Sequence, residues 1–145
     1  MGKRNLNLLV KVIGRRNRSS IILFILLELG CGSDKSFEKE YYSSGEIKSK
    51  YTLVENVREG QGYQYYKSGA VKQLSLWKNG MKNGISTSFY QNGQKKIESI
   101  FKDGYQDGET LFYDSLGHLR ERQFYSDNVL SGVFESFYQD GSNQD

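Results

Sequence analysis

The feature of this chain that most limits its fold is a 24-residue period that runs from about residue 41 to the end. Two columns of glycine and one column of mixed asparagine and glycine follow it. They are Gly45, Gly69, Gly93, Gly117 and Gly141; Gly60, Gly84, Gly108 and Gly132; and Asn56, Gly80, Gly104 and Asn128. Because asparagine is a common substitute for glycine where φ is positive, the third column predicts one left-handed backbone position used four times.

Large apolar side chains keep the same period. One column reads Tyr41, Tyr65, Phe89, Tyr113 and Phe137, and another reads Leu53, Trp77, Phe101 and Tyr125. Chance does not keep so many columns in one register, so the chain is an array of repeats. In the fourth unit, Phe112-Tyr113 looks like Phe89-Tyr90 placed one residue early. This predicts a local slip that a longer turn at residues 114–117 corrects.

Each unit contains two strand-like runs and two turn signals. One turn falls at the glycine of residues 44–45 and its equivalents, and the other falls at Asn79-Gly80 and Asp103-Gly104. Asn-Gly and Asp-Gly favour the type I′ turn of β-hairpins. Runs such as 70–78 and 94–102 fit strands, and the short links make neighbouring strands antiparallel. The expected fold is all-β, an elongated meander of nine or ten strands in stacked hairpins over residues 41–145, with four repeats and a partial fifth.

The repeat motif resembles a known family. Phe89-Tyr-Gln-Asn-Gly93 together with Phe101-Lys-Asp-Gly-Tyr-Gln-Asp-Gly108 is similar to the bacterial MORN-repeat variant family, which includes YwqK-type antitoxin proteins. Tyr65-Tyr-Lys-Ser-Gly69 with Trp77-Lys-Asn-Gly-Met-Lys-Asn-Gly84 is equally similar. The first unit departs from the motif at Leu53 and Asn56. The resemblance implies a hairpin-repeat fold and, through its antitoxin members, a protein that binds and neutralises a toxin.

The first 40 residues have a different character. Residues 1–20 are basic and polar, and residues 21–27 form an unbroken apolar run that is too short to span a membrane. A basic start followed by a short apolar core is typical of an export signal. Leu27-Glu-Leu-Gly-Cys31 resembles the lipobox of bacterial lipoproteins, although Glu28 departs from it. We therefore expect a signal peptide at 1–30, a lipid on Cys31 and a polar tether at 31–40; the alternative is an uncleaved anchor with an idle cysteine.

The net charge of the chain comes from this leader. The whole chain has a formal charge of +3, but residues 1–30 hold six of the 20 basic residues and one of the 17 acidic residues. The remainder is slightly acidic, so it has no bulk excess of positive charge with which to bind nucleic acid. We expect no nucleic-acid partner.

Alternation along the strands predicts which side chains share a face. Columns 47 and 53 are expected on one face and columns 48 and 50 on the other. Column 48 is basic and could meet acidic lipid headgroups or an anionic polymer, whereas a second set of tyrosines is expected to form an exposed stripe. Together these candidate binding residues are Lys48, Lys72, Lys96, Arg120, Tyr42, Tyr66, Tyr90 and Tyr138. The plainer alternative is a solvated sheet face, with the aromatic columns forming a core between repeats.

The chain offers little catalytic chemistry. Its one histidine, His118, follows a turn glycine, and its one cysteine is the expected lipid site. No Cys/His or metal-ligand cluster can be assembled from these residues. Carboxylate pairs such as Asp103 and Asp107 recur at turn positions, where they support backbone turns. We therefore expect no catalytic residues, no metal, no cofactor and no enzymatic activity.

The combined interpretation is an exported lipoprotein of the bacterial cell envelope, in an undecided membrane. Acylated Cys31 would anchor it, and its repeat sheet would act as a non-catalytic interaction or scaffold module for a protein, peptide or polysaccharide. Three alternatives stay open: an antitoxin or immunity protein, an enzyme of unknown type, and a structural envelope protein with no single partner.

Overall fold

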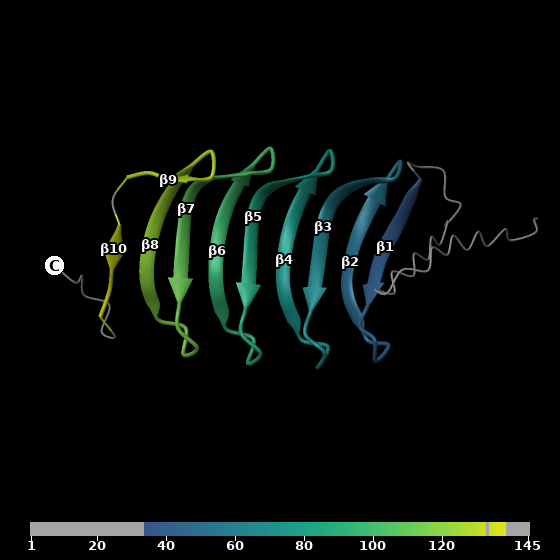
Figure 1. The fold of residues 1–145 in the computed structure, drawn as a ribbon, viewed down its shortest axis with the longest axis horizontal. Helices are drawn as coiled ribbons and strands as arrows, with labels where there is room; N and C mark the ends of the chain where they lie inside the picture. The colour runs from purple at the N-terminus through teal and green to yellow at the C-terminus, as the bar shows by residue number, and fades with distance from the viewer. Residues whose placement is uncertain (1–33, 133, 139–145) are drawn as a thin grey trace, which may run out of the picture.

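The structure, a computed structural model, describes residues 34–132 and 134–138, and it is all-β in this part of the chain, as expected (Figure 1). The expected signal peptide, Cys31 and Gly141 lie outside the described residues. The strands are β1 (Lys35–Tyr41), β2 (Ile47–Val54), β3 (Val57–Tyr65), β4 (Val71–Lys78), β5 (Met81–Phe89), β6 (Lys95–Lys102), β7 (Tyr105–Tyr113), β8 (Leu119–Ser126), β9 (Val129–Leu130) and β10 (Glu135–Ser136).

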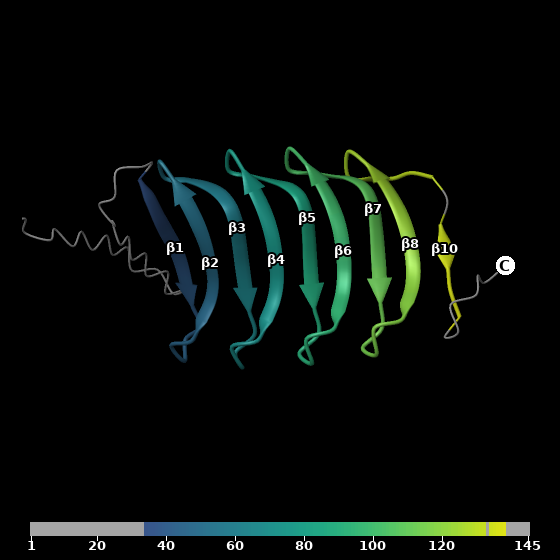
Figure 2. The same cartoon turned by 180° about the vertical axis from the view of Figure 1, so that it is seen from behind.

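These strands form one antiparallel sheet in which each strand from β1 to β7 pairs with the next along the chain. The order runs from β1 to β8 and then to β10, and β9 pairs with the end of β8. The turns alternate between the two ends of the strands: short turns lie at one end and longer turns at the other (Figure 2). The predicted meander of nine or ten strands is confirmed, because these links are too short to allow any other strand order.

The short turns have positive φ at two successive residues. The angles are 50° and 65° at Glu55 and Asn56, and 50° and 79° at Asn79 and Gly80. The equivalent turns at residues 103–104 and 127–128 share this conformation. Two left-handed residues define the type I′ turn, whose twist matches that of the flanking strands. The predicted left-handed column is therefore confirmed, and the residue before it is left-handed as well.

The long turns repeat one hydrogen-bond pattern in all four units. The Tyr90 N–H donates to the Gln94 carbonyl at 2.8 Å, and the Gly93 N–H donates to the Tyr90 carbonyl at 3.0 Å. Asp114 stands in the place of Tyr90 in the fourth unit, with the same two bonds at 3.0 and 3.1 Å. The predicted slip at residues 114–117 is wrong. The left-handed glycine sets the turn, whatever aromatic residue precedes it.

A β-bulge follows each long turn and re-aims the basic column. Tyr65 pairs with Val71 while Gln64 pairs with Gln73, so Lys72 is the extra residue of the bulge. The pairing shifts in the same way at Lys48, Lys96 and Arg120. A bulge breaks strict alternation of side chains.

The first repeat shows the consequence for the faces. Lys48 Nζ and Ser49 Oγ both reach the Glu40 carboxylate, at 3.1 and 3.4 Å, although they are adjacent in sequence. We expected the basic column and the next residue along the strand to lie on opposite faces, and this is wrong. Strict alternation assumes one residue per pairing position, whereas the bulge inserts an extra one.

The core lies on one face, which we call the inner face. Its middle row consists of small buried side chains, Ser75, Ser86, Ser99 and Thr110. Beside this row the rings of Tyr51 and Trp77 meet edge to face, with centroids 5.5 Å apart. This contact joins Trp77 of a predicted aromatic column to Tyr51, which belongs to neither predicted column. The opposite, outer face exposes apolar side chains at Leu76, Ile85 and Ile100.

The sheet begins earlier than expected. Residues 35–40, predicted as part of a polar tether, form most of β1 and pair with β2 throughout. Charged residues occupy this strand, but they have partners in the sheet: Arg58 donates two hydrogen bonds to Glu38, at 2.8 and 3.0 Å. Lys50 lies over the ring of Phe37 at 4.2 Å. Polar composition alone therefore misplaced this boundary of the repeat domain.

Candidate binding surface

Three of the four stripe tyrosines link successive repeats. The hydroxyl of Tyr42 donates to the Tyr65 carbonyl at 2.7 Å, and the hydroxyl of Tyr66 donates to the Phe89 carbonyl at 2.7 Å. Tyr90 makes the equivalent bond at 2.8 Å. All three are half-buried, whereas Tyr138 is 54% exposed. The structure therefore places Tyr42, Tyr66 and Tyr90 in links between hairpins, and only Tyr138 as an exposed ring.

Backbone hydrogen bonds from the short turns link successive repeats in a second way. The N–H of the second turn residue donates to a strand carbonyl of the preceding repeat. These bonds join Gly80 to Arg58 at 3.0 Å, Gly104 to Lys82 at 2.8 Å and Asn128 to Gln106 at 2.9 Å. Because hydrogen bonds link successive repeats at both ends of the strands, surface groups in successive repeats are held in constant relative positions.

The basic column lies against the linking tyrosines and divides into two kinds. At its ends, Lys48 pairs with Glu40 at 3.1 Å and Arg120 pairs with Asp114 at 2.8 Å. In the middle, Lys72 Nζ lies 5.9 Å from the ring centre of Tyr66, and Lys96 Nζ lies 5.5 Å from that of Tyr90. Neither middle lysine forms an ion pair within the described residues. The free positive charge of the column is therefore at Lys72 and Lys96.

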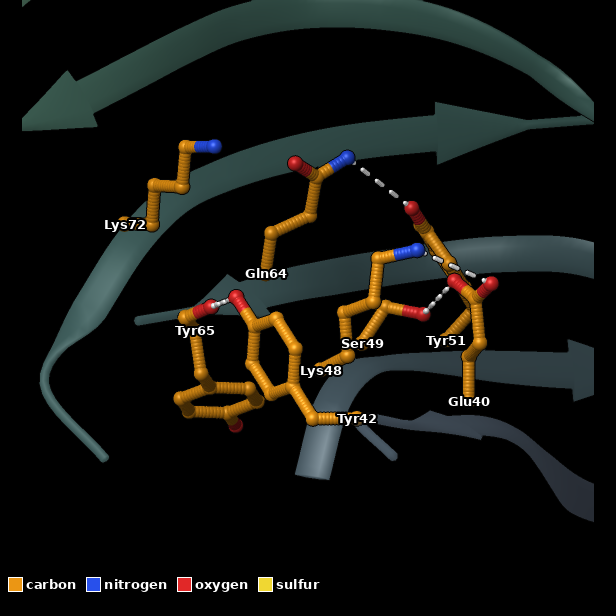
Figure 3. A pocket seen from close by; sticks show the side chains of 8 residues that line it. All are labelled: Glu40, Tyr42, Lys48, Ser49, Tyr51, Gln64, Tyr65 and Lys72. Carbon is orange, nitrogen blue, oxygen red and sulfur yellow. Dashed lines mark hydrogen bonds and ion pairs between the residues drawn. The ribbon is translucent and has the colours of Figure 1, made fainter. Parts of the chain in front are cut away.

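A pocket opens beside this column where the first and second repeats meet (Figure 3). Its volume is about 180 Å³, and side chains from β1 to β4 surround it. The Gln64 amide donates to the Tyr51 hydroxyl at 3.3 Å across one wall. The lining residues are Glu40, Tyr42, Lys48, Ser49, Tyr51, Gln64, Tyr65 and Lys72. Two candidate lysines and one candidate tyrosine from the sequence thus meet at one site.

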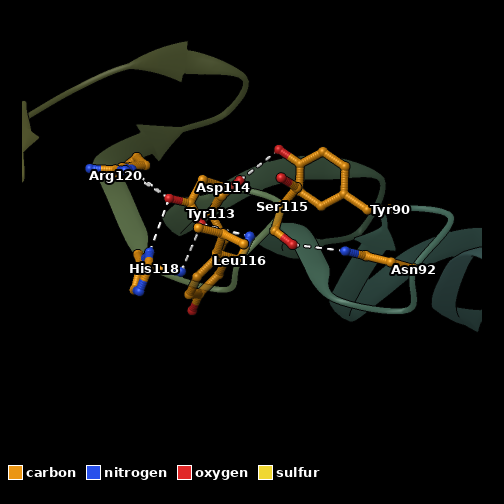
Figure 4. Close-up of polar contacts among 8 residues, drawn as sticks. All are labelled: Tyr90, Asn92, Tyr113, Asp114, Ser115, Leu116, His118 and Arg120. Carbon is orange, nitrogen blue, oxygen red and sulfur yellow. Dashed lines mark hydrogen bonds and ion pairs between the residues drawn. The ribbon is translucent and has the colours of Figure 1, made fainter. Parts of the chain in front are cut away.

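In the fourth repeat a carboxylate organises the long turn (Figure 4). Asp114 accepts hydrogen bonds from the N–H groups of Leu116 and His118, at 2.9 and 3.0 Å, and from Arg120 Nε at 2.9 Å. His118 Nδ1 lies 3.2 Å from the same carboxylate. Burial acts to raise the pKa of Asp114, but these donors outweigh it and hold the pKa well below its usual range. His118 is thus placed as an exposed turn residue, as the sequence suggested.

Two cations on the inner face, Arg58 and Lys82, were not among the candidate residues predicted from the sequence. The guanidinium of Arg58 lies 3.8 Å from the ring centre of Tyr51 and 4.9 Å from that of Trp77. Its hydrogen bond to Glu38 raises its pKa, against the effect of burial. Lys82 lies 4.8 Å from the ring centre of Phe101, and burial lowers its pKa. Both residues precede Gly60 or Gly84 by two positions, a periodic signal that the glycine columns could have revealed.

The described part of the chain holds no group of three or more His, Cys, Asp or Glu residues arranged to bind a metal ion. Within the same residues, no helix is long and apolar enough to cross a membrane.

Comparison with known families agrees with the period. Residues 58–79 and 82–103 each match the MORN repeat variant, and the two matches begin 24 residues apart. No curated protein matches the chain. The chain therefore contains two MORN-variant repeats, and the hydrogen-bonded links extend the same architecture to the units on either side.

Proposed function

We propose that this protein is a non-catalytic interaction module, anchored to a membrane of the cell envelope as a lipoprotein. One observation supports it most: a single-layer sheet, linked between repeats at both ends of its strands, holds Lys72 and Lys96 in equivalent positions, and neither lysine has a carboxylate partner in the part of the chain that the structure describes. Repeat arrays of this kind present extended surfaces for binding. Apolar side chains on the outer face, including the half-exposed Ile85, add a second surface of the type that marks interaction sites.

The anchor is supported by the sequence of the leader. A basic start, a short apolar run and Leu-Gly-Cys31 are together what an exported lipoprotein requires. Only residues 32–34 separate Cys31 from the first residue of β1, so acylation would hold the sheet close to the membrane. Radioactive palmitate should label the wild-type protein in cells, and Cys31→Ala should abolish the label. Equal labelling of the two proteins would remove the anchor from the proposal.

The interaction role is tested by crosslinking from defined positions in the native cell. A photoreactive residue at Ile85 reports on the outer face, and one at Lys72 reports on the basic column. We expect a discrete adduct from at least one of these positions. A matched probe at Ser68, in an exposed long turn, controls for random capture. If neither face yields more adduct than Ser68, the interaction module is wrong.

The identity of the adduct also tests the role implied by the family resemblance. A captured toxin would support an antitoxin or immunity protein, which is still a binding function. Catalytic turnover of any captured molecule by the purified chain would contradict the non-catalytic part of the proposal.

A further inference from the structure

The pocket beside Lys72 depends on one residue that the other repeats lack. Tyr51 forms a wall and receives a hydrogen bond from Gln64. At the equivalent positions of the next two repeats stand Ser75 and Ser99, which are buried and small. The same backbone position therefore holds a large aromatic side chain in the first repeat and a small hydroxyl side chain in the next two.

A bulge directs the lysine toward this pocket. Lys72 is the extra residue between two regular pairs, Tyr65 with Val71 and Gln64 with Gln73. Bulges often re-aim a side chain beside a functional site. Lys72 has no carboxylate partner among the described residues, whereas Lys48, on the other side of the pocket, is neutralised by Glu40. The lining therefore carries one net positive charge and suits a group with a single negative charge.

The remaining lining groups suit a ligand with several hydroxyls. The Ser49 hydroxyl and the Gln64 amide can each donate and accept hydrogen bonds. Glu40 accepts hydrogen bonds from Lys48 and Ser49, and the remaining lone pairs of its carboxylate can accept further hydrogen bonds from ligand hydroxyls. Aromatic surface comes from Tyr42 and Tyr51 (Figure 3).

The volume limits the size of the ligand. About 180 Å³ holds roughly six water molecules, and it is below the ~300 Å³ at which pockets for drug-sized molecules begin. A single sugar ring is of this scale. Lys96 lies two strands further along, about 10 Å away and outside the lining, so a single ring held at Lys72 does not reach it.

We propose that this pocket binds one acidic sugar residue of a polysaccharide, with its carboxylate at Lys72 and its hydroxyls at Glu40, Ser49 and Gln64. This inference rests on the proposed interaction function and names a ligand class for it. Tyr51 and Lys72 are specificity residues: Tyr51 supplies the wall that Ser75 and Ser99 replace in the next two repeats, and Lys72 supplies the positive charge of the lining that has no carboxylate partner among the described residues.

The test uses the full chain in neutral detergent and titrates it with an oligomer of galacturonic acid, followed by calorimetry. The fully methyl-esterified oligomer of the same length is the matched ligand control, because it keeps the rings and removes the charge. We expect the esterified oligomer to bind at least about tenfold more weakly. Lys72→Gln should weaken binding of the acidic oligomer by about the same factor.

Lys96→Gln is the matched protein control. Lys96 has the same bulge position and the same contact with a tyrosine ring, but it does not line the pocket. We expect it to change affinity less than about threefold. Equal losses from Lys72→Gln and Lys96→Gln would overturn the pocket in favour of unspecific attraction to a basic column. Both lysines are exposed, so both variants should keep the thermal unfolding midpoint of the wild type.

A second arm separates sugars from lipids. Vesicles of phosphatidylglycerol and of phosphatidylcholine are compared in a flotation assay, with Cys31→Ala to remove any acyl chain. Binding to the anionic vesicles without binding to the oligomer would overturn the sugar assignment. If the oligomer fails to bind while crosslinking still captures a partner, the pocket inference falls and the interaction module stands. Failure of both experiments would remove both.

Discussion

The first and the fourth repeats both depart from the small side chains that fill the middle of the inner face, but only the first compensates. In the second repeat Ser75 and Ser86 face each other, with their hydroxyl oxygens 2.8 Å apart. The first repeat places Tyr51 opposite Gly62. A Cβ on Gly62 would lie 2.5 Å from Tyr51 Cδ1, so glycine is required there by close approach. One large and one absent side chain occupy the space of two small ones.

The fourth repeat has no such compensation. Phe134 occupies the position that Gly62 and Ser86 hold in their repeats, and the residue facing that position is Gln123. Phe134 is 54% exposed and lies outside any strand, and the last strand is divided into β9 and β10 around it. A hairpin of this kind therefore accepts a large inner residue only where its partner is small. Close packing makes the sum of the two volumes the constraint.

The two ends also differ in how they are linked. The tyrosine hydroxyl that joins each repeat to the next is present at Tyr42, Tyr66 and Tyr90 and is replaced by the carboxylate of Asp114 in the fourth repeat. Asp114 bonds within its own turn and to Arg120. The long turn of the fourth repeat thus makes its side-chain bonds locally, and it is less tied to the segment after β8.

The largest expected effect breaks the compensation in the first repeat. Gly62→Ala should destabilise the protein by about 2 kcal/mol, because the added methyl group overpacks the space between Tyr51 and Trp77. Urea unfolding measures the change. The same substitution made in a Tyr51→Ser background should cost less, because the nearer of the two obstructing rings is gone and Trp77 has room to move away from the added methyl group. Equal costs in the two backgrounds would contradict the compensation.

The links between repeats predict a smaller loss. Tyr66→Phe keeps the ring and removes the hydroxyl bond to the Phe89 carbonyl, so it should destabilise the protein by about 1 kcal/mol. Tyr138→Phe is the control at the other end of the tyrosine column, where the side chain is exposed, and it should have no measurable effect. Thermal unfolding of both variants makes the comparison. If Tyr66→Phe left the stability unchanged, the hydrogen bond to the Phe89 carbonyl would contribute nothing beyond what water supplies.

The C-terminal end should gain from a smaller side chain. Phe134→Ser restores the residue type of the second repeat, so β9 and β10 should join and the protein should gain about 0.5–1 kcal/mol from new strand hydrogen bonds. Hydrogen exchange at the amides of Gly132 and Glu135 should slow. Phe134→Leu keeps a large side chain and should leave these rates unchanged. Slower exchange in both variants would show that bulk is not the cause of the break.

The smallest effect concerns the turn of the fourth repeat and its pH dependence. The folded-state pKa of Asp114 is depressed, so its contribution to stability is present above its ordinary pKa near 3.8 and is lost as the pH falls below that value. Wild type should therefore exceed Asp114→Asn in stability at neutral pH, and the difference should shrink below pH ~4. Unfolding curves at several pH values measure it. A difference that stays constant down to pH ~3 would contradict the assignment.

Much of the fold follows from the periodic columns. Positive φ at Asn56 and Gly80, strands near 70–78 and 94–102 and the antiparallel order all depend on local rules for turns and short links. The exceptions are informative. The slip expected at Asp114 came from matching aromatic residues, and the tether expected at residues 35–40 came from composition. In both places contacts with other strands decided the structure.

The candidate site was less predictable than the fold. The sequence indicated the basic and tyrosine columns as residues of interest, but it placed Lys72 by simple alternation and Tyr66 in solvent. The bulge at Lys72 and the hydroxyl bond of Tyr66 both depend on a backbone group in a neighbouring strand. A pattern of side-chain types contains no information about which carbonyl lies within reach of a hydroxyl.

By itself the sequence determined the repeat: its length, its turns, its strand order and the small or aromatic character of each column. These properties are local, since they depend on φ preferences and on residues a few positions apart. Only the tertiary structure decided that strands begin at residue 35, which cations lack a carboxylate partner among the described residues, and that Tyr51, paired with Gly62, forms a wall of a pocket. Those outcomes depend on volumes and hydrogen bonds between residues about 10 to 23 positions apart, which meet only when the hairpins stack.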